Sequence, residues 1–194
     1  MAKRGEKRPV RLEMAMPEDV GPLAVLANLA FDDDREWQPG WLHEGNLKEE
    51  DPSKGPPATS YEWRKDVIEK LSRRDRKASD TTFYKVILGD DRVVGGVLVV
   101  DRPDLGEGAW RSEVLFVDPD NHDRGIGREI LRQMFREHPD VKRWALDTPD
   151  WATRNHAFYG KMGFEHYLTK DEPGLPFKLY DFENTMTQEE RLKL

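Results

Sequence analysis

Short runs of apolar residues, separated by turn residues, dominate the chain, and most of them have the length of a β-strand. Gly89-Asp90-Asp91 stands between two such runs and predicts a hairpin turn. The pattern predicts seven strands, at residues 10–15, 82–88, 92–100, 110–117, 143–147, 164–169 and 177–182.

Apolar residues spaced three or four apart predict helices among these strands. The predicted helices cover residues 20–31, 60–72, 126–138 and 154–162. Within the third helix, five apolar positions fall on one stripe, as expected for a helix that packs on a sheet: Ile126, Ile130, Leu131, Met134 and Phe135. Strands with helices inserted between them predict a single α/β (α+β) domain over residues 1–194, rather than a helix bundle or a sandwich.

Composition narrows the class of protein. Residues 1–9 are basic and contain no apolar segment, so we expect a flexible tail rather than a secretory signal. No run approaches the roughly 18 apolar residues of a membrane span, and the expected location is cytoplasmic. The net charge of −7 argues against nucleic-acid binding. The absence of cysteine excludes disulfides, thiolate ligands and a cysteine nucleophile, and the five histidines lack metal-ligand spacing, so no metal is predicted.

Residues 117–131, VDPDNHDRGIGREIL, place two glycines where a strand runs into a helix. Glycine is a poor helix former, so Gly125 and Gly127 serve either an unusual turn or the close approach of a ligand. A helix N-terminus offers unpaired N–H groups and a positive dipole end, which suit phosphate. The dinucleotide fingerprint would need glycine at Ile130, and the nucleotide P-loop would need Lys-Ser/Thr after Gly127. On this stretch alone, a phosphate site and a ligand-free turn both remain open.

A second motif, Phe158-Tyr159-Gly160-Lys161-Met162-Gly163-Phe164, changes that balance. Together with Val117-Asp118-Pro119 and Arg124-Gly125-Ile126-Gly127, it resembles the GNAT superfamily of acetyl-CoA-dependent N-acetyltransferases over residues 82–182. The resemblance implies the GNAT fold, a central mixed, mostly antiparallel sheet of about six to seven strands with about four flanking helices. In that fold the sheet is splayed between its fourth and fifth strands.

The resemblance also implies where coenzyme A would bind. In the family the glycine turn holds the pyrophosphate through backbone amides, and this role falls here on His122, Asp123, Arg124, Gly125, Ile126, Gly127 and Arg128. The backbone of Phe116 and Val117 would pair with the pantetheine arm. Asn155 follows the family's usual Asn position, where this chain has Ala152, and either replaces that cofactor contact or caps the helix. His122 replaces the usual Gln or Arg, and Asp123 places negative charge beside an anionic ligand.

Two groups carry the chemistry that the resemblance implies. Tyr159 matches the tyrosine that acts as general acid and protonates the departing thiolate; the alternative is that it only packs beside Phe158. Glu113 occupies a strand position where family members often carry the base that deprotonates the amine; the alternative is an exposed strand glutamate. Asp147, near the end of the next strand, is a rival for this role.

Asp33, Asp34, Trp37 and Trp41 lie where the family's substrate loops fall, and carboxylates with aromatic rings suit a cationic amine; a solvated surface is the alternative. The resulting hypothesis is direct transfer of an acetyl group from acetyl-CoA to a primary amine of a small molecule or peptide. Two alternatives remain, a non-catalytic GNAT-fold module that binds acyl-CoA or a protein partner, and a phosphate-binding enzyme of another fold. Homodimers are common in the family, but no residue of the sequence identifies an interface.

Overall fold

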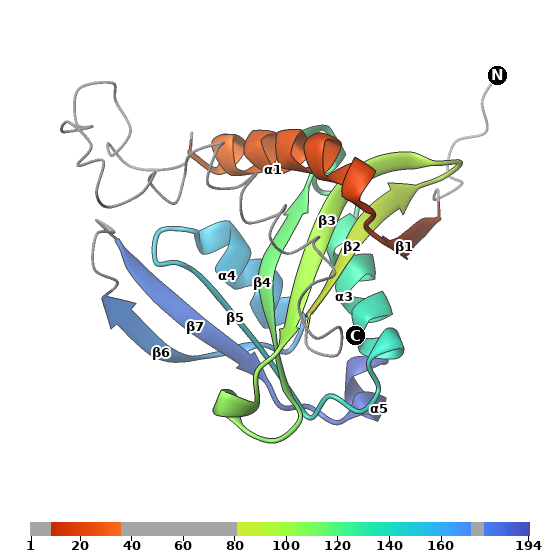
Figure 1. The fold of residues 1–194 in the computed structure, drawn as a ribbon. Coiled ribbons are helices and arrows are strands. Elements are labelled where there is room, and N and C mark those ends of the chain that lie inside the picture. The colour runs from red at the N-terminus through yellow and green to blue at the C-terminus, as the bar shows by residue number, and fades with distance from the viewer. Residues whose placement is uncertain (1–8, 36–80, 172–176) are drawn as a thin grey trace.

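The structure is a computed structural model that describes residues 9–35, 81–171 and 177–194 (Figure 1). The strands in these residues are β1 (Val10–Met14), β2 (Thr81–Leu88), β3 (Arg92–Asp101), β4 (Ala109–Val117), β5 (Arg143–Pro149), β6 (Glu165–Asp171) and β7 (Lys178–Asn184). The α-helices are α1 (Val20–Arg35), α3 (Ile126–Glu137), α4 (Thr153–Lys161) and α5 (Gln188–Arg191).

All seven strands join one mixed sheet in the order β1-β2-β3-β4-β5-β7-β6. Every neighbouring pair is antiparallel except β4 and β5, which run parallel. Their pairing covers only Ala109–Arg111 with Arg143–Ala145. Because β4 continues to Val117 and β5 to Pro149, the sheet is splayed between its fourth and fifth strands (Figure 1). This confirms the predicted mixed, mostly antiparallel, splayed sheet with flanking helices.

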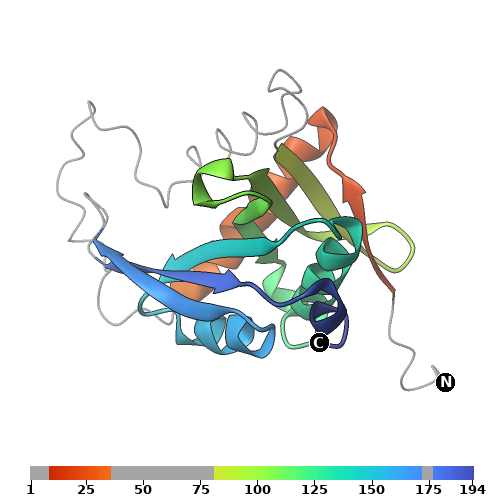
Figure 2. The ribbon, with the colours of Figure 1, turned by 90° about the horizontal axis from the view of Figure 1, so that it is seen from below.

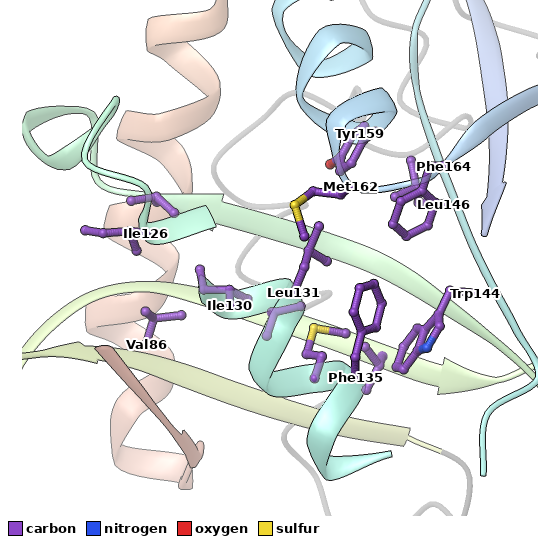
Figure 3. Packing of buried hydrophobic residues seen from close by; sticks show 14 of the residues in the cluster. Val86, Ile126, Ile130, Leu131, Phe135, Trp144, Leu146, Tyr159, Met162 and Phe164 are labelled. Atoms are coloured by element: carbon purple, nitrogen blue, oxygen red, sulfur yellow. The ribbon is translucent and has the colours of Figure 1, made fainter. Parts of the chain in front are cut away.

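Each face of the sheet has its own hydrophobic core. On one face, α1 packs against β3 and β4, with a core of Val20, Leu23, Ala24, Ala27, Ala30, Phe83, Leu98 and Phe116. On the other face lies a larger core that includes buried side chains of α3, β5 and α4, such as Phe135, Trp144 and Tyr159 (Figure 3). α5 packs beside α3 near the C-terminus (Figure 2).

The apolar stripe predicted for α3 is fully buried in the larger core: Ile126, Ile130, Leu131, Met134 and Phe135 are all at most 4% exposed. This stripe fixes the helix on the sheet (Figure 3). A loop over residues 118–125, which contains the short 3₁₀ helix Pro119–Asn121, leads from the end of β4 to the N-terminus of α3, where the two glycines lie.

The predicted strands are all confirmed, with ends that differ by at most two residues. The predicted helix 20–31 extends to Arg35, and the helix predicted at 60–72 lies outside the described residues. The four-residue helix α5 was not predicted, because so short a segment shows no periodicity. Its one sequence signal is a capping box, in which Thr187 accepts from the N–H of Glu190 and the Glu190 carboxylate accepts from the N–H of Thr187.

His138 follows α3 inside an aromatic cluster of the larger core. Its Nε2 lies 3.1 Å from the hydroxyl oxygen of Tyr84, and its ring centre lies 4.6 Å from that of Trp110. Burial lowers the pKa of His138, and the charge of Glu137 opposes this effect. The neutral imidazole is therefore the form that the folded state favours.

We expect the free energy of unfolding to fall as the pH drops below about 6.5, because His138 of the unfolded chain takes up a proton there while the folded chain resists it. Denaturant unfolding at about pH 8 and about pH 5 tests this. His138→Gln should lose less stability over this interval than the wild type, and the exposed His166→Gln should lose as much. An unchanged pH dependence in His138→Gln would contradict the assignment.

Candidate functional site

The splay holds a cavity of about 390 Å³ between α1, β4, the loop that follows β4, and α4. Its apolar wall includes Phe31 of α1 and Phe158 of α4. The structure brings nine of the ten residues predicted for cofactor binding to its lining: Phe116, Val117, His122, Asp123, Gly125, Ile126, Gly127, Arg128 and Asn155. The tenth, Arg124, lines an adjacent groove beside β1 and β3.

One edge of β4 faces this cavity without a neighbouring strand. The β4–β5 register ends at the pair Arg111 and Ala145, so β5 offers no partner to residues 112–117. Leu115, Phe116 and Val117 all line the cavity. Backbone N–H and C=O groups on such an edge can pair with any extended chain that carries amides.

Asp118 locks the turn that connects β4 to the glycine segment. Its Oδ1 accepts from the backbone N–H of Asp120 at 3.1 Å, and its Oδ2 accepts from Asn121 Nδ2 at 2.8 Å. The same Oδ2 pairs with Arg92 Nη2 at 3.1 Å, and the Asp118 N–H donates to Val94 O. The buried carboxylate thus ties the loop to β3 and fixes where the next helix begins.

Two left-handed residues shape the glycine turn. Asp123 has φ of 57° and Gly125, the N-cap of α3, has φ of 77°. Glycine adopts this conformation without the strain that a side chain brings. The first helical hydrogen bond joins the N–H of Glu129 to Gly125 O, so the N–H groups of residues 126–128 have no helical acceptor. These donors and the helix dipole make the turn suitable for an anion.

Gly127 has a different reason to be glycine. A Cβ at this position would lie 3.1 Å from Cζ and 3.4 Å from Cε2 of Phe158. The missing side chain therefore lets the Phe158 ring of α4 pack directly on the first turn of α3. Gly125 thus supplies the turn and Gly127 admits the Phe158 ring, while the close approach of a ligand to this segment stays a prediction.

The two residues that depart from the family pattern have identifiable contacts. His122 Nε2 lies 2.8 Å from Val117 O, and as a donor to that carbonyl it ties the turn to the end of β4. Asp123 points to solvent, with its side chain 91% exposed, and pairs with Arg154 Nη2 at 3.5 Å. The negative charge of Asp123 is thus turned outward and is accompanied by a cation.

The charged and polar side chains around the turn differ in how firmly they are held. Arg124 and Arg128 are exposed, and Arg128 Nη2 contacts the backbone oxygen of Leu194. Asn155 Nδ2 lies 3.4 Å from Thr148 Oγ1 at the end of β5. Ala152, not Asn155, is the N-cap of α4, so the capping alternative for Asn155 is wrong. Its half-buried amide lines the cavity.

Tyr159 is buried on α4 within the larger core, at 8% exposure, next in sequence to Phe158, which lines the cavity (Figure 3). Its ring centre lies 5.1 Å from that of Phe158, 5.9 Å from that of Phe164 and 6.2 Å from that of Phe182. The ring of Tyr159 therefore packs in the core, as the packing alternative expects. A buried phenol still carries a proton that it can donate.

Glu113 is the bulged residue of β4. The β3–β4 register pairs Leu98 with Val114 and Val99 with Ser112, which leaves Glu113 as the extra residue. Its carboxylate is half-exposed and lies 3.4 Å both from Arg102 Nη1 and from Arg111 Nε. The predicted base thus lies two residues beyond the last β4–β5 pair and is shared between two guanidinium groups.

Arg111 is the centre of a charged cluster that joins three strands across the splay. It contacts Asp147 Oδ2 of β5 through Nη2 and Asp181 Oδ1 of β7 through Nη1, the latter at 3.4 Å. Lys170 Nζ of β6 lies 2.6 Å from Asp181 Oδ2. Burial lowers the pKa of Arg111, but the charges of Asp147, Glu113 and Asp181 outweigh it and raise this pKa. Arg111 is therefore a permanent cation.

Asp147 behaves differently from an ordinary surface aspartate. Burial raises the pKa of its carboxyl group, Arg111 lowers it, and Asp181 and Glu113 raise it again, with a net shift upward. Its side chain is nevertheless 32% exposed, so the carboxyl group can exchange protons with its surroundings.

Several site residues could not be read from the sequence. No motif position covers Arg111, Asp181, Asn121 or Phe31. The one available signal, for Arg111 and Asp181, was a charged residue inside an apolar strand pattern. Of the predicted acceptor residues, Trp37 and Trp41 lie outside the described residues. Asp33 and Asp34 fall in the last turns of α1, and their side chains are not described.

No helix within residues 9–35, 81–171 and 177–194 combines the length and apolar character that crossing a membrane requires. In the same part of the chain, no three His, Asp or Glu side chains are grouped so that they could hold a metal ion.

A mixed sheet that splays after a short parallel pairing, with a glycine turn at the head of the splay, defines a GNAT fold. Residues 79–166 match the family model described as an acetyltransferase (GNAT) domain. This segment of the chain thus resembles a GNAT acetyltransferase domain, as its motifs predict.

Similarity to individual proteins is weaker in sequence than in fold. The uncharacterized protein YrkN of Bacillus subtilis (strain 168) is 32% identical over 79 residues, which are 40% of this chain and 42% of that relative. The PaiA N-acetyltransferase of Thermoplasma acidophilum, solved with coenzyme A, is 15% identical with a TM-score of 0.67 over 92% of this chain and 99% of its own. The spermidine N-acetyltransferase of Vibrio cholerae, solved with CoA and spermine, is 10% identical with a TM-score of 0.64 over 94% and 98%. At these identities the two structures establish the fold alone.

Proposed function

We propose that this protein is an N-acetyltransferase that transfers the acetyl group of acetyl-CoA directly to a primary amine. One observation carries the proposal: the unpaired edge of β4 and the free N–H groups at the start of α3 meet at a single cavity. Coenzyme A combines an amide-bearing arm with a pyrophosphate, and these two features suit the two halves of the cavity. The CoA complexes of the T. acidophilum and V. cholerae proteins support this choice of cosubstrate.

The pyrophosphate would accept hydrogen bonds from the N–H groups of residues 125–128, with Arg124 and Arg128 adding positive charge. The pantetheine arm is about as long as four or five extended residues, roughly 15 Å. From the glycine turn it would run back along Val117 and Phe116 of β4. Because His122 already uses Val117 O, we expect the arm to depend more on Phe116 and Leu115. The thioester would then reach the bulge at Glu113.

The proposed chemistry uses groups near the bulge and on α4 that lie next to the lining residues in the sequence or in the sheet rather than among them. An unpaired backbone N–H at the bulge can polarise the thioester carbonyl as the amine attacks. The tetrahedral intermediate then expels the thiolate, which takes a proton from Tyr159. A carboxylate must first deprotonate the ammonium form of the amine. Glu113 is the candidate from the sequence and Asp147 is its rival; both belong to the cluster around Arg111.

The acceptor class is a primary amine on a small molecule or peptide. Excess carboxylate around the bulge favours a cation over an anion. The V. cholerae protein, named as a spermidine N-acetyltransferase, shows that this fold can serve such an acceptor.

Two measurements on the purified chain test the proposal. Acetyl-CoA should raise the thermal midpoint, and a panel of primary amines should contain acceptors that release free CoA from acetyl-CoA. Stabilisation without turnover of any amine would support the alternative of a non-catalytic acyl-CoA-binding module. The absence of stabilisation by acetyl-CoA would contradict both readings.

Tyr159→Phe should lower kcat about 100-fold and leave the affinity for acetyl-CoA nearly unchanged, because only the proton donor is removed. Steady-state kinetics with the best amine of the panel, together with calorimetric titration of acetyl-CoA, separate the two quantities. Tyr180→Phe, on β7 beside the same core, is the matched control and should retain the wild-type kcat. Full kcat in Tyr159→Phe would reduce this residue to its packing role.

A further inference from the structure

Asp147 and Asp181 occupy directly opposed positions of β5 and β7, where two like charges are unfavourable. Asp181 is completely buried: its Oδ1 accepts a hydrogen bond from Arg111, whereas its Oδ2 forms an ion pair with Lys170 but has no hydrogen-bond donor among the described residues. Arg111 also contacts Asp147, but through Oδ2 alone. Among the described residues, Asp147 Oδ1 has no hydrogen-bond donor, and the side chain is 32% exposed.

The position of Asp147 relates it to the reacting atoms. Leu146 and Phe182 belong to the core under α3, so Asp147 and Asp181, one residue further along, face the opposite side of the sheet. Asp147 also lies two residues beyond Ala145, the last residue of β5 that pairs with β4. It therefore stands at the mouth of the splay, next to the bulge at Glu113, on the face opposite to α3.

The charge balance of the cluster leaves room for one more cation. Four carboxylates, those of Asp104, Glu113, Asp147 and Asp181, form ion pairs with three cations, Arg102, Arg111 and Lys170. Glu113 lies against both Arg102 and Arg111, whereas Asp147 has a single guanidinium contact and an open oxygen. An incoming ammonium group would supply the missing positive charge at Asp147.

We propose that Asp147, held by Arg111 against buried Asp181, binds the ammonium group of the acceptor and takes its proton, while Glu113 serves only to attract the cation. This inference rests on the proposed acetyl transfer. Arg111 is a positioning residue: it fixes one oxygen of Asp147 and leaves the other to the amine. The upward shift in the pKa of Asp147 agrees with a carboxylate that must hold a proton briefly.

The protons balance along this route. Asp147 takes one proton from R–NH₃⁺, and the neutral nitrogen forms a C–N bond with the thioester carbon. The C–S bond then breaks, the thiolate takes the phenol proton of Tyr159, and the tyrosinate recovers a proton from the nitrogen of the new amide. Asp147 releases its proton to solvent, so the products are the amide, CoA–SH and one proton.

Two amines of similar size test the assignment. The nitrogen of butylamine is protonated at neutral pH, whereas that of 2,2,2-trifluoroethylamine is largely neutral and needs no base to activate it. Asp147→Asn should lower kcat/KM about 100-fold with butylamine and less than about 10-fold with trifluoroethylamine, and should remove the acidic limb of the pH profile. Glu113→Gln should lower kcat/KM less than about 10-fold with either amine.

Glu183→Gln is the matched control. Glu183 lies two residues beyond Asp181 on β7 and pairs with Arg143 at 2.7 Å rather than with Arg111 or Lys170, so this variant should keep the wild-type kcat/KM. An equal loss with both amines in Asp147→Asn, or a larger loss in Glu113→Gln, would overturn the assignment. So would a wild type that is stabilised by acetyl-CoA but does not acetylate butylamine. Failure of acetyl-CoA to stabilise the wild type would instead contradict the proposed function itself.

Discussion

Gly127→Val is expected to weaken acetyl-CoA binding at least about 100-fold, which corresponds to about 2.8 kcal/mol. A Cβ alone would lie 3.1 Å from Phe158 Cζ, and the two methyl groups of valine extend further. They would push the Phe158 ring into the cavity and displace the first turn of α3, whose N–H groups we assign to the pyrophosphate. Calorimetric titration of acetyl-CoA into wild type and variant measures the difference.

Gly160→Ala is the matched control for this substitution. Gly160 lies on α4, and a Cβ there would meet nothing within 4 Å, so acetyl-CoA affinity should stay at the wild-type level. Circular dichroism of the unliganded Gly127→Val variant establishes whether it is folded. A folded Gly127→Val variant with wild-type affinity would contradict the placement of the pyrophosphate. If valine prevents folding, Gly127→Ala provides the same comparison. Its single methyl group only presses on Phe158, so the expected loss of acetyl-CoA affinity is smaller.

Arg191→Met is expected to lower the free energy of unfolding by about 3 to 5 kcal/mol. Arg191 is 1% exposed, and burial lowers the pKa of its guanidinium. Its donors bind Val141 O at 2.6 Å, Lys142 O at 2.9 Å, and both Oδ1 and O of Asn184. Methionine fills much of the same space but leaves these oxygens buried without a donor. Urea denaturation measures the loss.

Arg136→Met is the control, because Arg136 is exposed and forms a surface ion pair with Glu129 at 3.4 Å; its loss should stay below about 0.5 kcal/mol. A comparably small loss for Arg191→Met would show that the C-terminal helix α5 does not anchor the fold. The hydrogen bonds of Arg191 to Val141 and Lys142 also support the candidate functional site. Val141 and Lys142 lead directly into β5, whose first residues form the short parallel pairing that precedes the splay.

The strands and α3 could be predicted because their signals are local. Apolar runs between turn residues fix the strands, and five apolar positions at helical spacing fix the buried face of α3. Arg191 shows the limit of that approach. A positively charged residue in a polar C-terminal segment reads as surface, and only the tertiary structure places it over the Phe135 ring among backbone carbonyls.

The glycine turn and the cluster around Arg111 also differ in whether their signals are local in the sequence. The glycine turn could be predicted because its shape depends on a left-handed backbone at Gly125 and on the absence of a side chain at Gly127, and both requirements appear in sequence as glycine. The cluster of Arg111, Asp147 and Asp181 could not, because Arg111 and Asp147 are 36 residues apart and meet only through the register of β4 with β5. Sequence therefore identified Glu113 and Asp147 as separate candidates but not the arginine that joins them.

The departures from the family pattern also have a physical account. Asp123 adopts a left-handed conformation that Asp tolerates better than most residues, and its exposed carboxylate pairs with Arg154, which also lines the cavity. The Nε2–H of His122 donates to Val117 O and is therefore not offered to the ligand. We therefore expect backbone N–H groups to be the principal hydrogen-bond donors to the pyrophosphate, with Arg124 and Arg128 adding positive charge.

Titration of ¹⁵N-labelled protein with acetyl-CoA, followed through its backbone amide signals, tests the central claim most directly. The signals of Gly125, Ile126, Gly127 and Arg128 should shift in a saturable manner, together with those of Leu115 and Phe116 on the unpaired edge of β4. Amides of α5, on the far side of α3, should stay in place. Saturable shifts that spare the glycine turn, or no saturable shift at all, would contradict the account.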